Sequence, residues 1–207
     1  MIKNFWLLLF FLGPAMAADP EVGKILRPVE GAAFPPGEIS IIATAPGGKL
    51  ALDGQAVPAE QPFPDVLLAK TTPSAGIHKL ELIWETGRRQ LRFFVGDHPP
   101  AEFKPFRQHP PSALECTQCH GLSRKGRFRF TGGCFGCHQQ ETFLKTHHHP
   151  SHVLEQCGQC HNAHGSTEKA HLILPSEKAC GLCHSVPELF KRQMFSPQRR
   201  GGAEAGL

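Results

Sequence analysis

The chain has 207 residues, with 22 Lys and Arg against 18 Asp and Glu, a formal net charge of +4 and 40% hydrophobic residues. This length allows one or two small domains and excludes a large multidomain assembly within the chain. Beyond the first 17 residues, no run is apolar enough to cross a membrane.

The first 17 residues have the pattern of a secretory signal peptide. Lys3 precedes an apolar run over residues 5–12, and residues 15–17 form a small-x-small cleavage site. A membrane anchor is the alternative, but the run is too short to span a bilayer and Pro14 interrupts it. We therefore expect cleavage after Ala17, a periplasmic or otherwise exported protein without a transmembrane span, and no nucleic acid partner.

Residues 18–97 have the pattern of a small all-β sandwich. Apolar residues alternate in short runs bounded by turn signals, and Asp53-Gly54 is a hairpin signal. The predicted strands cover residues 38–44, 49–52, 55–57, 65–70, 78–84 and 90–95. His78 lies in one of these strands, and we expect it to be structural. We see no catalytic constellation in this part of the chain.

This half resembles the immunoglobulin-like modules of bacterial exported proteins at the level of pattern. The features are the opening at residues 26–31, the turn at residues 52–54 and the run at residues 76–80. The resemblance implies a module that binds a partner, packs against a domain or spaces it. A Pro-rich linker at residues 98–111 follows, and we expect it to be fairly stiff.

All eight cysteines lie in four identical CxxCH frames. The frames are Cys116–His120, Cys134–His138, Cys157–His161 and Cys180–His184, with cysteines at 116, 119, 134, 137, 157, 160, 180 and 183. Each frame is the attachment pattern of c-type haem, in which two thiols bind the macrocycle and the next His binds the iron. The pattern therefore predicts four covalent haems, held by Cys116, Cys119, Cys134, Cys137, Cys157, Cys160, Cys180 and Cys183.

Two other interpretations of the cysteines, disulfides and zinc sites, explain fewer of these residues. Four disulfides would suit an oxidising compartment but leave the four adjacent histidines without a role. Zinc sites use two CxxC pairs per metal and do not require a His directly after each pair. Residues 112–196 are also poor in large aliphatic residues, so we expect a haem-cored domain of mostly irregular structure and short helices. Residues 197–207 have the composition of a disordered tail.

The proximal iron ligands predicted from the frames are His120, His138, His161 and His184. Seven further histidines lie in this half, at positions 109, 147, 148, 149, 152, 164 and 171, and four of them would complete bis-histidine ligation. The distal candidates are His109, His148, His149, His152, His164 and His171, and at least one of residues 147–149 is expected to be a ligand. Met194 is a lesser candidate for a sixth ligand.

His164 is not expected to be the distal partner of His161. If the frame continues as a helix, residues three apart have Cβ atoms about 5–6 Å apart. Two imidazoles that bind one iron from opposite faces of a haem need their Cβ atoms about 12 Å apart, given metal–nitrogen bonds of about 2 Å and the lengths of the rings. His164 should therefore ligate a neighbouring haem. The first pair of frames has no local counterpart of His164, so it is expected to borrow a His from the second pair.

The segment from His148 to Ser185 resembles the multihaem c-type cytochromes with a doubled CxxCH motif. The shared features are the His-Pro lead-in, the CxxCH-x-x-His-Gly-Ser run, the following Leu and the closing CxxCH. A looser copy begins at His109, which makes the domain two dihaem units in tandem. The resemblance implies closely spaced bis-histidine haems and electron transfer in anaerobic respiration, in periplasmic carriers, porin–cytochrome conduits or cytochrome filaments.

Three functions remain open at this stage. The first is an electron carrier or relay between other redox proteins, including inner- or outer-membrane cytochrome complexes. A protein with this function would not be an enzyme. The second is a structural or conduit subunit of a larger complex or filament, joined through the β module. The third is a small reductase with one open haem site. The basic run at residues 123–130 is expected to pair with haem propionates or to dock an acidic partner.

Overall fold

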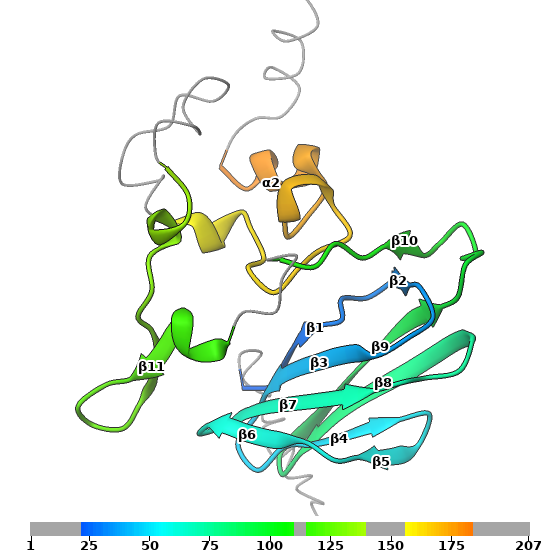
Figure 1. The fold of residues 1–207 in the computed structure, drawn as a ribbon, viewed down its shortest axis with the longest axis horizontal. Helices are drawn as coiled ribbons and strands as arrows, with labels where there is room; N and C mark the ends of the chain where they lie inside the picture. The colour runs from blue at the N-terminus through cyan, green and yellow to red at the C-terminus, as the bar shows by residue number, and fades with distance from the viewer. Residues whose placement is uncertain (1–21, 110–114, 140–155, 184–207) are drawn as a thin grey trace, which may run out of the picture.

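The computed structural model describes residues 22–109, 115–139 and 156–183. The predicted signal peptide and the C-terminal tail lie outside these ranges. The described chain consists mostly of β-strands, with a few short helices (Figure 1). Two parts are named below: the sandwich, residues 22–107, and the Cys-rich segment, residues 115–139 and 156–183.

The sandwich contains two sheets. One has the strand order β1-β3-β7-β6 and the other the order β10-β2-β9-β8-β4-β5. The strands are β1 (Lys24–Arg27), β2 (Ala32–Phe34), β3 (Ile39–Thr44), β4 (Lys49–Leu52), β5 (Gln55–Val57), β6 (Glu60–Phe63), β7 (Val66–Thr71), β8 (Gly76–Trp84), β9 (Gly87–Val95) and β10 (Lys104–Pro105). Most pairs are antiparallel, but β2 pairs in parallel with both β9 and β10.

Inward-facing aliphatic and aromatic residues of both sheets form one core. Burial alternates along β3, as expected for a strand with one face against a core. Ile41 from one sheet and Leu80, Leu82 and Phe93 from the other are fully buried in the same cluster. At about 1.5–3 kcal/mol for each large apolar side chain buried, this cluster is the main source of stability for the sandwich.

The six strands predicted from the sequence are confirmed: β4 and β5 have the predicted bounds, and the other four differ by one to three residues at an end. The hairpin signal at Asp53-Gly54 is also confirmed, because both residues have positive φ, 51° and 82°, as a two-residue hairpin turn requires. Strands β1, β2, β6 and β10 were not predicted, since each has at most four residues and none adjoins a hairpin signal such as the one that marks β4 and β5. His78 lies on β8 and is buried, with its ring nitrogens 2.7 Å from Asp53 Oδ2 and 2.8 Å from the Ser74 carbonyl oxygen.

Part of the predicted linker lies against the sandwich. Residues 104–105 form β10 beside β2, and the Phe106 amide donates to the Ala33 carbonyl at 2.8 Å. Phe103 is buried, and the Phe106 ring lies 4.9 Å from the ring of Phe34 in the core. Residues 103–106 are therefore an added edge of the sheet and not a free spacer.

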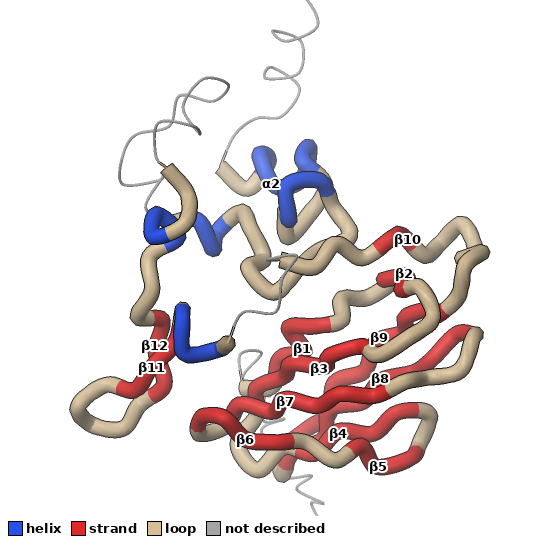
Figure 2. Tube along the Cα trace, in the orientation of Figure 1, coloured by secondary structure: helices blue, strands red, loops and turns tan. Residues whose placement is uncertain are grey.

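The Cys-rich segment contains little regular structure, as expected. Its elements are η1 (Cys116–Gln118), β11 (His120–Leu122), β12 (Phe128–Phe130), η2 (Cys134–Gly136), η4 (Cys157–Gln159), η5 (Lys169–His171) and α2 (Ser176–Gly181). Figure 2 shows these short helices joined by long loops, whereas the strands concentrate in the sandwich. Within the described ranges, no helix has the length and apolarity needed to cross a membrane.

The helical continuation assumed for the third frame is wrong. After the turn at Cys157–Gln159, His161 forms an isolated bridge with Leu172, and the Asn162 amide donates to the His171 carbonyl at 2.7 Å. The backbone therefore leaves the turn in an extended direction. The relation between His161 and His164 must be taken from the positions of their rings, which are described next.

Candidate haem-binding site

The four CxxCH frames share one local backbone geometry. In each, the amide of the second cysteine donates to the carbonyl of the first at 3.2 Å, which closes a single tight turn. Three of these turns are the short helices η1, η2 and η4, and the fourth follows the last residues of α2. Because the turn brings both side chains of a frame to one place, each thiol pair can hold one ligand. No two of the eight cysteines are joined in a disulfide.

Successive frames lie next to one another. The Cys134 thiol hydrogen-bonds to Cys157, and burial together with that contact and the nearby Cys119 raises the pKa of Cys134. The pKa of Cys160 is also raised, first by burial and then by Cys180, Cys183 and Cys157. Neighbouring frames in the sequence are therefore neighbours in space.

His164 lies opposite His120, the histidine of the first frame. The two ring centroids are 6.0 Å apart and the ring planes are within 4° of parallel. His164 therefore reaches from the second pair of frames to the first, the neighbour that the sequence predicted would need a borrowed ligand.

The electrostatic surroundings keep both of these imidazoles neutral. Burial, followed by the nearby His120, Arg27 and His109, lowers the pKa of His164 to about 4. Burial also lowers the pKa of His120, an effect that the Arg129 backbone partly offsets. A neutral imidazole keeps the lone pair that a metal ion requires, so both residues are in the form that ligates iron.

A second pair consists of His109 and His138, the histidine of the second frame. Their ring centroids are 5.9 Å apart and their planes differ by 18°. His109 Nδ1 is 3.3 Å from the Ala163 carbonyl oxygen, which can only accept, so Nδ1 carries the proton and Nε2 keeps its lone pair. The His171 ring is closer to His109 than the His138 ring is: their centroids are 5.1 Å apart and their planes differ by 67°.

These separations agree with those expected for two ligands of one iron. Metal–nitrogen bonds of about 2 Å, plus about 1.1 Å from nitrogen to ring centre, put two opposite imidazoles about 6 Å apart, centre to centre. The pairs His120–His164 and His109–His138 meet this distance, whereas the pair His109–His171 is too close. His171 stays a distal candidate predicted from the sequence.

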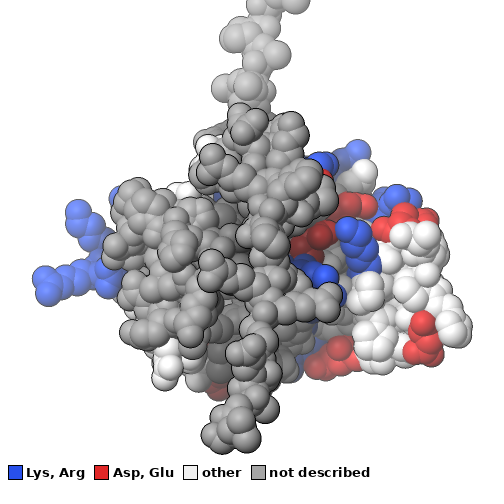
Figure 3. All heavy atoms as spheres, turned by 90° about the horizontal axis from the view of Figure 1, so that it is seen from above, with Lys and Arg blue, Asp and Glu red and all other residues white. Residues whose placement is uncertain are grey.

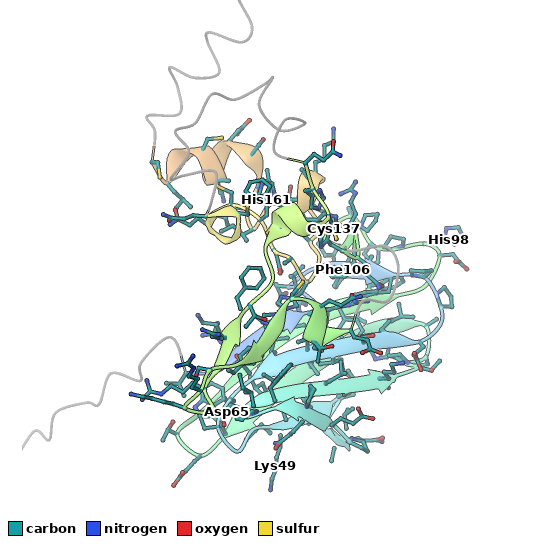
Figure 4. All side chains as sticks on the ribbon, turned by 60° about the vertical axis from the view of Figure 1, so that its left-hand side comes forward. Lys49, Asp65, His98, Phe106, Cys137 and His161 are labelled. Atoms are coloured by element: carbon teal, nitrogen blue, oxygen red, sulfur yellow. The ribbon has the colours of Figure 1, made fainter. Side chains whose placement is uncertain are left out.

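The histidine of the third frame is oriented as an iron ligand should be. His161 Nδ1 is 2.6 Å from the Ala170 carbonyl oxygen, so Nδ1 donates and Nε2 is left for a metal. The next residue, His171, has a φ of 56°. Its Nδ1 atom is buried and has no hydrogen-bond partner. Figure 4 labels His161 together with Cys137 of the second frame.

The surroundings of the frames also suit a large apolar group. Ala179 is the only buried hydrophobic residue in the described part of the Cys-rich segment. Five large apolar side chains there are instead exposed by 41–62%: Leu122, Phe130, Phe135, Ile173 and Leu182. In the described ranges, no group of three or more His, Cys, Asp or Glu side chains is arranged so that it could hold a bare metal ion. The donor set and the exposed apolar surface fit covalent haem.

Some predicted ligands lie outside the described residues. These are the proximal His184 and the distal candidates His148 and His149 with their neighbour His147, together with His152 and Met194. The axial partner of His161 and both ligands of the fourth frame therefore stay predictions from the sequence.

The contact that holds the His164 loop against the sandwich was not predicted from the sequence. Gly165 has φ of 113°, and a side chain there would collide with the Phe106 ring and lie 2.6 Å from the Arg107 carbonyl oxygen. Ser166 is buried and exchanges two backbone hydrogen bonds with Arg107, at 2.8 and 3.0 Å. The Gly-Ser pair after His164, which is part of the motif, was the only available signal.

Comparison with known proteins supports the same cofactor. Residues 148–188 match the family model of the doubled CXXCH motif, which covers less than half of the chain. No curated protein matches. Among solved structures, the chain is similar to an FMN-binding beta-glucuronidase from Facaelibacterium prausnitzii L2-6, at 14% identity and a TM-score of 0.32, over 40% of this chain and 13% of that one. The chain thus spans a small fraction of that protein, and the likeness is too low to carry an argument.

The motif match supports a multihaem c-type cytochrome, with covalently bound c-type haem iron as its cofactor. Such a protein transfers electrons and acts with redox partners.

Proposed function

We propose that this protein is an exported tetrahaem c-type cytochrome that carries single electrons between redox partners in anaerobic respiration. The observation that carries the proposal is the pair of opposed imidazoles, His120 with His164 and His109 with His138. Export is inferred from the signal-peptide pattern of residues 1–17 and from the compartment in which haem is attached to CxxCH thiols.

The chain's residues have defined roles in this proposal. The paired thiols of each frame would form the thioether bonds, and the histidine that ends each frame would take one axial position. His164 would complete the first site and His109 the second. When bound, haem iron supplies a one-electron Fe(III)/Fe(II) couple whose potential depends on axial ligands, burial and hydrogen bonding.

Two protein ligands on one iron favour a carrier over a reductase. A reductase needs an open axial position for its substrate, and in each of the two described pairs a second imidazole would take that position. The neutral, half-buried His164 and the Ala163 and Ala170 carbonyls beside His109 and His161 would stabilise this arrangement. The protein would therefore move electrons without making or breaking a substrate bond.

The spacing of the frames supports a relay within the chain. The hydrogen-bonded thiols of Cys134 and Cys157 join the two pairs of frames, and Cys160 lies beside the fourth frame. We propose that the four sites follow the order of the sequence in space.

A conduit or filament subunit is the second candidate, and the sandwich is the observation that favours it. We propose that this part is an immunoglobulin-like module that would join a partner through a sheet edge such as β10, which pairs with β2 on one side only. The Lys and Arg side chains at the tip of the β11–β12 hairpin, at the left edge of Figure 3, are exposed and suit an acidic redox partner.

The spectrum of the purified protein tests the carrier proposal. We expect low-spin ferric signals by paramagnetic resonance and no carbon monoxide binding to the reduced protein. H164A should convert one haem to a high-spin form that binds carbon monoxide, because His120 would lose its opposite ligand. H98A is the control: His98 is exposed and lies outside the CxxCH frames, so this variant should leave the spectrum unchanged.

Two results would contradict the proposal. A high-spin, carbon monoxide-binding haem in the unaltered protein would favour the reductase. A low-spin spectrum of H164A identical to that of the unaltered protein would remove His164 from the ligand set. Sizing and electron microscopy over a range of concentrations separate the carrier from the filament subunit.

A further inference from the structure

Arg27, at the end of β1, is a buried cation that the sandwich does not neutralise. The residue is only 9% exposed, and its Nε atom is buried without a hydrogen-bond partner. One Nη atom donates to the Gln108 side-chain oxygen at 2.7 Å, and the guanidinium lies 5.4 Å from the centre of the Phe106 ring. Both contacts are with uncharged groups.

A buried guanidinium is costly unless an anion accompanies it. The ion pairs among the described residues join other side chains, and none includes Arg27. Removing a cation from water costs several kcal/mol unless it is paired and hydrogen-bonded. Burial accordingly lowers the pKa of Arg27. The free Nε donor and the absent carboxylate both indicate an anionic partner supplied by something other than the described chain.

Arg27 is positioned at the His164 loop. The Asn162 side chain donates to the carbonyl of Leu26, the residue before Arg27, at 3.4 Å. Gly165 lies against Phe106, the ring that also contacts the Arg27 guanidinium. Phe106, which Figure 4 labels, therefore lies between the sandwich and the ligand loop and is shared by both.

We propose that Arg27 of the sandwich binds a propionate carboxylate of the haem whose iron His120 and His164 would hold, and that it raises the reduction potential of that haem. The proposal rests on the function proposed above. A propionate is a carboxylate carried by the cofactor itself, and a guanidinium is the side chain best suited to bind it with two parallel hydrogen bonds.

The direction of the effect follows from electrostatics. Reduction removes one positive charge from the iron, so a nearby cation favours the reduced form. The effect is large only where solvent does not screen it, which the burial of Arg27 ensures. Because Arg27 lies near one ligand pair, its influence should fall on one of the four haems.

Gln108 and Phe106 are the residues that hold the guanidinium in place. Both belong to the segment that forms β10 and continues toward His109, the proposed ligand of the second site. The sandwich would thus act on the haem region in two ways, by orienting the His164 loop and by supplying a fixed positive charge.

The test is a potentiometric titration of the full-length holoprotein. R27Q should shift the midpoint of one haem downward and leave the other three unchanged. R27K, which keeps the charge, should restore a midpoint close to that of the unaltered protein. R92Q is the matched control, because Arg92 is an exposed arginine of the same sandwich, 3.9 Å from Glu30, and its titration should match the unaltered protein.

A second measurement keeps the proposal falsifiable if R27Q does not fold. Redox-difference infrared spectra of R27K should show a shifted propionate carboxylate band, since lysine cannot reproduce the paired hydrogen bonds of arginine. An R27Q titration that superimposes on that of the unaltered protein would overturn the inference, as would an unchanged band in R27K. A purified protein without haem would instead overturn the proposed function.

Discussion

The sandwich and the Cys-rich segment are stabilised in different ways. In the sandwich, Ile41, Leu80, Leu82 and Phe93 are fully buried, and β8 and β9 pair along nine residues each. In the described part of the Cys-rich segment, only Ala179 is a buried hydrophobic residue, and Leu182 is 62% exposed. The sandwich therefore folds around a core of its own side chains, whereas the described part of the Cys-rich segment has no such core and gathers thiols and imidazoles instead.

This difference indicates what the cofactor contributes. A short segment with almost no buried apolar surface cannot offset the conformational entropy that folding costs, about 1–2 kcal/mol per residue for the backbone alone. Covalent macrocycles would supply the missing apolar contacts and cross-link distant loops. The sandwich needs no such help, so it offers a rigid support for the loop that carries His164.

The largest expected effect is the loss of haem attachment. Replacing all eight cysteines by alanine should leave the Cys-rich segment unfolded while the sandwich keeps a cooperative unfolding transition, because only the sandwich has its own core. Hydrogen exchange resolved by peptide should then show protection of β3, β8 and β9 and none in residues 115–139. Equal protection of both parts in this variant would contradict the distinction.

The reverse experiment is a cavity in the sandwich core. Leu82 is fully buried, so L82A should lower the free energy of unfolding of the sandwich by about 2–5 kcal/mol. Chemical denaturation followed by circular dichroism measures this, and the haem absorption spectrum should stay the same in native buffer. I83A, at a side chain that is 44% exposed on the same strand, is the control and should cost much less.

The contact between the two parts can be weakened at Gly165. G165V forces a β-branched residue to φ of 113° and into the Phe106 ring. We expect a loss of about 1–3 kcal/mol, seen as faster amide exchange at Phe106 and Arg107. G158A, where a Cβ meets only open space, should exchange as the unaltered protein does. Unchanged exchange in G165V would show that the loop does not dock as described.

The smallest effect is expected at the β4–β5 turn. Asp53 accepts hydrogen bonds from the Lys79 amide at 2.8 Å and from His78 at 2.7 Å, and D53A should cost about 1–2 kcal/mol. D53N, which tolerates the positive φ, should cost less. Thermal unfolding compares the two, and equal losses would argue against a role for the backbone conformation.

The Asp53 carboxylate also gives the sandwich a pH dependence. Burial raises its pKa, but the hydrogen bonds from Lys79 and His78 outweigh this, so the pKa lies below the ordinary value. The contribution of Asp53 to stability is therefore present above pH about 4 and is lost as the pH falls through the lowered pKa. In D53A that part of the acid dependence should be absent.

Features that depend on local sequence were predictable. The CxxCH frames, the Asp53-Gly54 hairpin and the long alternating strands β8 and β9 each follow from residues a few positions apart. The short strands β1, β2 and β6 were missed because three or four residues carry too little periodicity, and no turn signal marks them as Asp53-Gly54 marks β4 and β5. They exist because longer neighbouring strands pair with them.

The site was predictable only as a set of candidates. That His164 faces His120 and His109 faces His138 depends on contacts between residues 29 or more positions apart, by the difference of their numbers. Arg27 is 137 positions from His164 by the same subtraction, and no local pattern relates an arginine on a first strand to a haem ligand. Such assignments follow from the packing of the chain and not from the motif.

The central claim is that each CxxCH frame holds one haem, and a combined haem assay and intact mass tests it most directly. We expect four haems per chain by pyridine haemochrome and a mass equal to residues 18–207 plus four covalent haems. A colourless protein, or a mass that corresponds to cysteines linked only to one another, would contradict it.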